Sequence, residues 1–206
     1  MNTTPFSTGF SRVCNEYLLV AKPDAAMGAA VRAERLHFDQ RYGEGLAVKA
    51  RPHIAVGSFL ATEEMERTLI AWMQRICSTN LSFTVLVNNY SGYPAHSIYL
   101  RVQNQQPLLQ LAKQLQQIDS YVAGNTGHAV RWNQAPHIMV AQRLTEEVYF
   151  NALVEYAHKE MTGTFVVDGL QLLRRTAPDA VAEKVAVFGL RPEVAPVFQH
   201  QQLQLF

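Results

Sequence analysis

The chain has 206 residues, 48% of them hydrophobic, and its 18 Lys+Arg against 17 Asp+Glu give a formal net charge of +1 at pH 7. A chain of this length and hydrophobicity buries a sizeable core, as one large domain or as two small lobes. The near-zero charge argues against a long nucleic-acid duplex as partner, because tight binding to a duplex requires many Lys and Arg contacts with phosphates.

The composition excludes several further classes of protein. Cys14 and Cys77 have no CxxC spacing and are interpreted as two reduced thiols, not as a disulfide framework. Residues 1–12 lack an apolar stretch of signal-peptide length, and no apolar run reaches the ~20 residues of a membrane span. Outside two motifs described below, the histidines show no metal-ligand spacing. We therefore expect a soluble cytoplasmic protein without membrane contact, metal or other cofactor; the sequence carries no signal for an oligomeric state.

The first half of the chain alternates apolar strands with helices. An apolar run over residues 17–22 predicts a buried strand, and the Ala-rich segment 24–41 predicts a helix. A second strand is expected over residues 47–59. Thr62 is a plausible helix N-cap, since the two glutamates that follow it suit the positive end of a helix. Alternating apolar residues over 81–88 predict a third strand.

The second half repeats this pattern. Its predicted elements are a strand over 96–103, a helix over 107–122, a loop over 124–127, a strand over 135–144, a helix that begins at Thr145, strands over 164–174 and 183–189, and a tail over 191–206.

An internal repeat is the most informative feature of the sequence. Pro-His-Ile occurs twice, with His53 and His137 lying 84 residues apart, and Thr-Glu-Glu follows at nearly the same interval, nine and eight residues later. The two copies and their long period predict one duplicated domain rather than a solenoid. We expect an α+β bilobal fold over residues 1–190, with two antiparallel sheets flanked by helices around a central cleft. The repeats that form the lobes span about 17–93 and 96–190.

Strand alternation predicts where the two histidines point. His53 and Ala55 share one face of their strand, His137 and Met139 share one face of theirs, and Ser58 falls on the face opposite His53. If the lobes pack by approximate twofold symmetry, both imidazoles enter one cleft. One histidine then takes a proton from an attacking hydroxyl or water while the other protonates a leaving oxygen, as phosphodiester cleavage requires. The alternative is that each histidine is a hydrogen-bonded structural residue.

These motifs resemble those of the 2H phosphoesterase superfamily, and within it the 2′-5′ RNA ligase and cyclic phosphodiesterase-like branch. That family carries two His-hydrophobic-Thr/Ser-hydrophobic motifs in a duplicated bilobal fold, and the resemblance extends over about residues 17–190. It implies that His53 and His137 are a catalytic pair that acts, without a metal, on 2′,3′-cyclic phosphates or 2′-5′-linked phosphodiesters. The implied partner is a nucleotide or a short RNA end.

The chain departs from the family pattern at both hydroxyl positions, which hold Ala55 and Met139. Removing one donor at a developing negative charge typically costs about 2.7–4 kcal/mol. Arg51 has the parity of His53 and is the candidate to contact a phosphate in their place. A degenerate, non-catalytic protein that binds a nucleotide or RNA end is therefore the alternative function.

Two tyrosines complete the candidate site. Tyr17 and Tyr99 occupy similar places in the first strands of the two repeats. They are expected either to flank the cleft and stack on a base, or to pack in the core.

Overall fold

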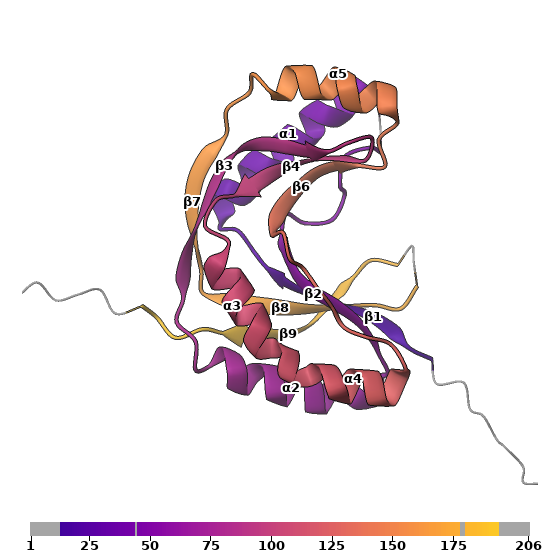
Figure 1. Ribbon diagram of the computed structural model, residues 1–206, viewed down its shortest axis with the longest axis vertical. Coiled ribbons are helices and arrows are strands. Elements are labelled where there is room, and N and C mark those ends of the chain that lie inside the picture. The colour runs from indigo at the N-terminus through magenta and orange to yellow at the C-terminus, as the bar shows by residue number, and fades with distance from the viewer. Residues whose placement is uncertain (1–12, 44, 178–179, 194–206) are drawn as a thin grey trace, which may run out of the picture.

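The computed structural model describes residues 13–43, 45–177 and 180–193, and it shows a curled antiparallel sheet with helices on its convex side (Figure 1). The strands are β1 (Asn15–Ala21), β2 (Ile54–Ala61), β3 (Phe83–Tyr93), β4 (Ser97–Val102), β5 (Arg131–Trp132), β6 (His137–Gln142), β7 (Thr162–Val167), β8 (Gly169–Arg175) and β9 (Glu183–Gly189). The helices are α1 (Ala25–Tyr42), α2 (Glu63–Cys77), α3 (Gln106–Leu115), the 3₁₀ helix η1 (Gln116–Ile118), α4 (Asp119–Thr126) and α5 (Glu146–Tyr156).

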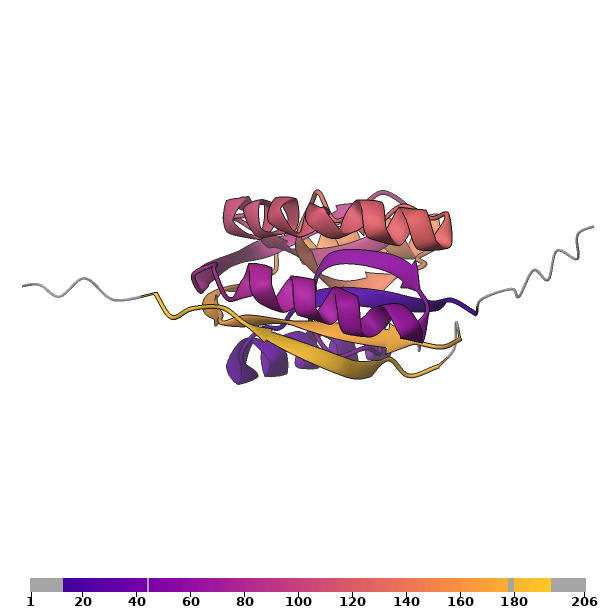
Figure 2. The same ribbon diagram turned by 90° about the horizontal axis from the view of Figure 1, so that it is seen from below.

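The sheet has two halves that meet at its centre. The strand order is β7-β3-β4-β6-β2-β1-β8-β9, with β5 beside β2, and β2 and β6 are in register at Ile54 and Ile138 alone. Helices α1 and α5 pack on the half that contains β6, and α2, α3 and α4 pack on the half that contains β2 (Figure 1). Seen from below, α2 and the α3–α4 segment run side by side (Figure 2). The predicted α+β bilobal class is confirmed, with the two antiparallel halves joined edge to edge.

Each half of the sheet combines strands from both sequence repeats. β1 pairs with β2 and with β8 from the end of the chain, and β8 pairs with β9. β3 crosses to the other half, where it pairs with β4 and β7. Such pairing joins strands that are distant in sequence, so it depends on the assembled core and not on local patterning.

The caps at the helix N-termini agree with the sequence in position. The Asp24 carboxylate accepts a hydrogen bond from the Met27 backbone N–H at 2.8 Å and caps α1. Thr145 caps α5 through its hydroxyl. Thr62 occupies the N-cap of α2, but its buried hydroxyl has no hydrogen-bond partner among the described residues.

Several predicted segments have other bounds or another form in the structure. The expected loop at 124–127 is the end of α4, which closes at Gly127 with a left-handed φ of 72°. The strand expected over 164–174 is two strands, β7 and β8, because the chain turns at Asp168 between them. Residues 1–12 and most of the predicted tail, 194–206, lie outside the described residues.

The core lies between the convex face of the sheet and the helices. The predicted inward residues Ile54, Val56, Ile138 and Val140 are at most 3% exposed. Their burial against the helices leaves the alternate residues of β2 and β6 on the concave face. In the part of the chain that the structure describes, no helix has the length and apolar character to cross a membrane.

Candidate active site

The pairing of β2 with β6 brings the two histidines together. Because Ile54 lies opposite Ile138 in an antiparallel pair, the register places His53 across from Met139, and Ala55 across from His137. These four side chains share the concave face, since the two isoleucines are fully buried on the other. The histidines are thus diagonal neighbours, a relation that typically places Cβ atoms within about 7–8 Å.

Both imidazoles are held in the same way. Nδ1 of His53 bonds to the Arg51 carbonyl at 2.7 Å, and Nδ1 of His137 bonds to the Ala135 carbonyl at 2.6 Å. A carbonyl only accepts hydrogen bonds, so Nδ1 carries the proton in the neutral ring. The free lone pair, or in the cation the free N–H, is then on Nε2.

The surroundings of the histidines favour their neutral form. Burial lowers the pKa of His53, and the positive charges of Arg35 and His137 lower it further, against the opposing effect of the bond to the Arg51 carbonyl. Burial also lowers the pKa of His137, against the bond to the Ala135 carbonyl. Both rings therefore exchange a proton below the ordinary histidine range near 6.5.

Arg35 links β6 to the segment that leads into β2. Its side chain, only 5% exposed, reaches from α1 and donates from Nε and Nη2 to the Met139 carbonyl at 3.1 and 2.6 Å. Nη1 donates to the carbonyl of Ala50, three residues before His53. Burial and the charge of Arg32 lower its pKa to about 10. The sequence did not reveal this residue, because it is one of several charged residues in an Ala-rich helix.

Comparisons with known proteins decide the family. The model of the 2′-5′ RNA ligase superfamily matches residues 23–179, more than half of the chain. This chain belongs to the 2′-5′ RNA ligase superfamily. No curated protein sequence matches it.

Solved structures of the same fold accompany this match. TT0787 of Thermus thermophilus has a TM-score of 0.61 at 16% identity, over 86% of this chain and 99% of that chain. Escherichia coli LigT complexed with 3′-AMP has a TM-score of 0.57 at 15% identity, with the same coverage. A structure described as a phosphoesterase has a TM-score of 0.59 at 16% identity, again with that coverage. The bilobal 2H architecture of the superfamily is thus shared.

Two aromatic rings lie beside His137 in this superfamily member. The Tyr99 ring is 4.7 Å from the imidazole between centroids, and the Tyr93 ring is 5.8 Å from it. Tyr99 and Tyr93 therefore both lie next to His137. Tyr93 was missed because it lies at the end of a strand that the sequence predicted to stop at residue 88.

Tyr17 is placed differently. Its ring is fully buried and stacked on Phe59 at 5.4 Å, and its hydroxyl donates to the Glu66 carboxylate at 2.7 Å. Of the two places expected for Tyr17, the structure shows the core and not the cleft, because the odd-numbered residues of β1 face the helices.

Ser58 also differs from the prediction. Along β1, Val20 is opposite Ala55, Leu19 is opposite Gly57 and Leu18 is opposite Ser58, so Val56 is an extra residue in β2. This bulge reverses the alternation and puts Ser58 on the concave face with Ala55. Strand alternation alone placed Ser58 on the opposite face. It could not predict the bulge, because a bulge depends on how the partner strand pairs.

A cavity of about 620 Å³ lies beside His53 in the lobe that contains β1, β2 and β8. Arg51 and Lys22 line it together with alternate residues of β1 and β8. Arg51 thus lines the same cavity as His53. Among the described residues, no group of three or more His, Cys, Asp or Glu side chains gathers as a metal site would require.

Proposed function

We propose that this protein is a cytoplasmic 2H-type phosphodiesterase that uses His53 and His137 as general base and general acid. Its substrates would be 2′,3′-cyclic phosphates or 2′-5′-linked phosphodiesters of nucleotides or short RNA ends. The observation that carries this proposal is the matched pair of imidazoles on one concave face, each with Nδ1 bonded to a carbonyl two residues earlier and with Nε2 left for chemistry.

The proposed hydrolysis of a cyclic phosphate needs two proton transfers. Nε2 of the neutral histidine takes a proton from water, whose oxygen forms a bond to phosphorus. The bond from phosphorus to one ribose oxygen breaks, and Nε2–H of the protonated histidine gives that oxygen its proton. Water adds across one P–O bond, and the two histidines end with their protonation states exchanged.

The charges around the two rings support an assignment of roles. Two positive charges, those of Arg35 and His137, add to burial in disfavouring the cationic form of His53, whereas burial alone lowers the pKa of His137. We therefore assign the neutral, proton-accepting role to His53. His137 lies beside Tyr93 and Tyr99 and is the acid for the leaving ribose oxygen. Surroundings that push two similar groups toward different protonation states are a common way to divide acid from base.

Known structures of the fold support a nucleotide as ligand. Escherichia coli LigT has been crystallised with 3′-AMP, with ATP and with NADP+. In the present protein, Tyr99 and Tyr93 offer aromatic faces on which a base can stack beside the reacting phosphate.

The loss of both motif hydroxyls favours a second candidate function. Ala55 and Met139 stand on the concave face where the family's hydroxyl residues bind phosphate, and neither side chain donates a hydrogen bond. A protein that binds a nucleotide or an RNA end without cleaving it would retain the cleft and Arg51 but would not need the two proton-transfer groups.

One experiment separates the two functions. The wild type, His53→Ala, His137→Ala and the control His158→Ala, an exposed histidine just after α5, are incubated with 2′,3′-cyclic AMP and 2′-5′-linked ApA in the presence of EDTA. Cleavage that is lost in the first two variants and retained in the control is the expected result. Saturable nucleotide binding with no cleavage by the wild type supports the binder, and cleavage that persists in both cleft variants contradicts the proposed chemistry.

A further inference from the structure

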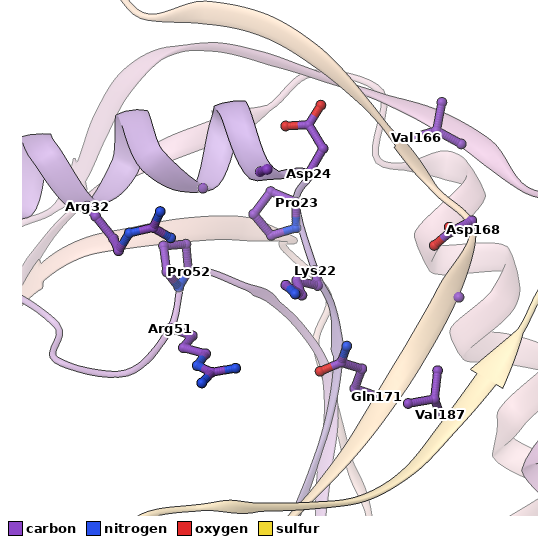
Figure 3. A pocket seen from close by; sticks show the side chains of 13 residues that line it. Lys22, Pro23, Asp24, Arg32, Arg51, Pro52, Val166, Asp168, Gln171 and Val187 are labelled. Atoms are coloured by element: carbon purple, nitrogen blue, oxygen red, sulfur yellow. The ribbon is translucent and has the colours of Figure 1, made fainter.

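A second cavity adjoins the cavity beside His53. It has a volume of about 650 Å³ and lies between the first turns of α1, strand β8 and the turn at Arg51 and Pro52 (Figure 3). Lys22, Arg51, Pro52 and Gln171 line both this cavity and the one at His53. A ligand that occupies the cavity beside His53 can therefore extend into this second cavity without leaving the protein surface.

Three cations line this second cavity. Figure 3 shows Arg32 and Arg51 on either side of the Pro52 ring, with Lys22 beside them. None of the three forms an ion pair with any residue that the structure describes. This accumulation is notable in a chain whose formal net charge is only +1.

The two carboxylates of the wall form no ion pair with these cations among the described residues. Asp24 uses its side chain to cap α1, where it accepts a bond from the Met27 backbone N–H. Asp168 lies on the opposite wall, next to β8 (Figure 3). The side of the cavity that is continuous with His53 is consequently cationic.

The position of Arg32 places a further positive charge close to the others. A Cβ atom at Gly28 would lie 3.4 Å from Nη1 of Arg32, so the guanidinium folds back along α1 over the bare glycine. There its charge acts on Arg35, and the charge of Arg35 acts in turn on His53. Like charges held together cost free energy, and a bound anion relieves that cost.

We propose that this cavity binds a second phosphate of the substrate, adjacent to the phosphodiester held between the histidines. Lys22, Arg32 and Arg51 would form the site, with Arg32 acting only on the second phosphate and Arg51 lying between the two. The substrate class is then a nucleotide that carries a further phosphate, such as the terminal nucleotide of an RNA chain with its 5′-phosphate, rather than a nucleoside 2′,3′-cyclic phosphate alone. This inference rests on the proposed function for its choice of substrate, but its test does not require turnover.

The test compares two ligands that differ by one phosphate. Titration calorimetry at constant ionic strength measures adenosine 2′-monophosphate and adenosine 2′,5′-bisphosphate with the wild type, Arg32→Gln, Arg51→Gln and the control Arg67→Gln. Arg67 is an exposed residue of α2, far from the cavity in the chain and absent from its wall. We expect the 5′-phosphate to improve affinity at least tenfold in the wild type and in the control, and less than threefold in Arg32→Gln and Arg51→Gln.

Two results would overturn the proposal: equal affinity of the wild type for both ligands, or a preference for the bisphosphate that survives both Arg32→Gln and Arg51→Gln. Arg51 lies outside the helices, so Arg51→Gln still tests the site if Arg32→Gln fails to fold. The outcome is separable from the proposed function. A bisphosphate preference without any cleavage by the wild type upholds the second site while the phosphodiesterase fails. Cleavage without such a preference upholds the phosphodiesterase and overturns the second phosphate site.

Discussion

The two strands that carry the histidines have nearly the same backbone. In each, Nδ1 of the histidine bonds to the carbonyl two residues earlier, and an extra residue follows three positions later, Val56 in β2 and Val140 in β6. Even the bulge carbonyls match, since Val56 accepts from the backbone N–H of Asn133 and Val140 from that of Val48, both at 3.0 Å. The duplication has therefore preserved the geometry around both histidines.

The side chains around the two strands differ. His53 faces cations, with Arg51 and Lys22 on the same cavity wall. His137 faces the rings of Tyr93 and Tyr99. Under the proposed function, the side at His53 would bind phosphate and the side at His137 would bind a nucleoside. Two equivalent imidazoles thus acquire different surroundings from elements outside the repeat motif, and this difference is what the following experiments address.

The largest expected effect tests whether the two halves act as one catalytic unit. We expect His53→Gln and His137→Gln each to lower kcat about 10²–10⁴-fold, because each removes one proton transfer. The double variant is expected to lose little more, since residues that act together are strongly non-additive. Steady-state kinetics on a 2′,3′-cyclic nucleotide measures this, and multiplicative losses would contradict a shared step.

Arg35 joins the halves, so its removal tests their connection. Arg35→Ala leaves the Ala50 and Met139 carbonyls without their donor, and we expect the free energy of unfolding to fall by about 2–4 kcal/mol. Urea denaturation measures the change. Arg67→Ala is the matched control, with an expected change within about 0.5 kcal/mol. Equal stability of the two variants would show that Arg35 does not hold the strands together.

The aromatic half is tested by a pair of tyrosines in similar strands. Tyr99→Ala is expected to weaken nucleotide binding by about 1–3 kcal/mol, the typical contribution of a stacked base. Tyr99→Phe retains the ring and is expected to bind normally. Tyr17→Phe removes only a buried hydroxyl from its bond to Glu66, so its effect is expected in thermal stability and not in affinity. Normal nucleotide affinity of Tyr99→Ala would show that the base does not stack on this tyrosine.

Restoring the family's hydroxyl tests the two halves separately. Ala55→Thr and Met139→Thr each place a donor on the concave face, one on either strand. We expect either variant to raise kcat/KM about tenfold, which corresponds to about 1.4 kcal/mol. This gain is smaller than the roughly 2.7–4 kcal/mol typical of a native donor, because the surroundings are not preorganised for the new hydroxyl. Ala55→Val and Met139→Leu are the apolar controls. A gain in the controls as large as that in the threonine variants would argue against a hydrogen bond.

The smallest effect concerns pH. Burial lowers the pKa of both histidines in the folded protein, whereas the unfolded chain has the ordinary value near 6.5. Below pH 6.5 the unfolded chain therefore binds protons that the folded protein does not, so stability falls as the pH decreases. Denaturation at several pH values should show this slope reduced in His53→Gln and unchanged in His158→Gln. The acidic limb of the pH–rate profile should likewise lie below pH 6.5.

Sequence patterning located most elements, and it failed where partner strands intervene. The alternation around His53 and His137 was correct over the few residues that follow each histidine. It failed at Ser58, because the bulge at Val56 reverses the faces of β2. Tyr17 and Tyr99 have equivalent positions in the sequence, yet one lies in the core and the other in the cleft. Their strands have different neighbours, which no local pattern encodes.

The sequence by itself determined the duplication, the family motifs, their departure at Ala55 and Met139, and the starts of the helices. These features depend on residue identity, short-range periodicity and caps within a few residues. The tertiary structure alone decided that β2 and β6 pair, that Arg35 donates to carbonyls on both sides of that pairing, and that cations gather on one side of the cleft and tyrosines on the other. Those contacts join residues far apart in the chain, and only the assembled core brings them within hydrogen-bonding or Coulombic range.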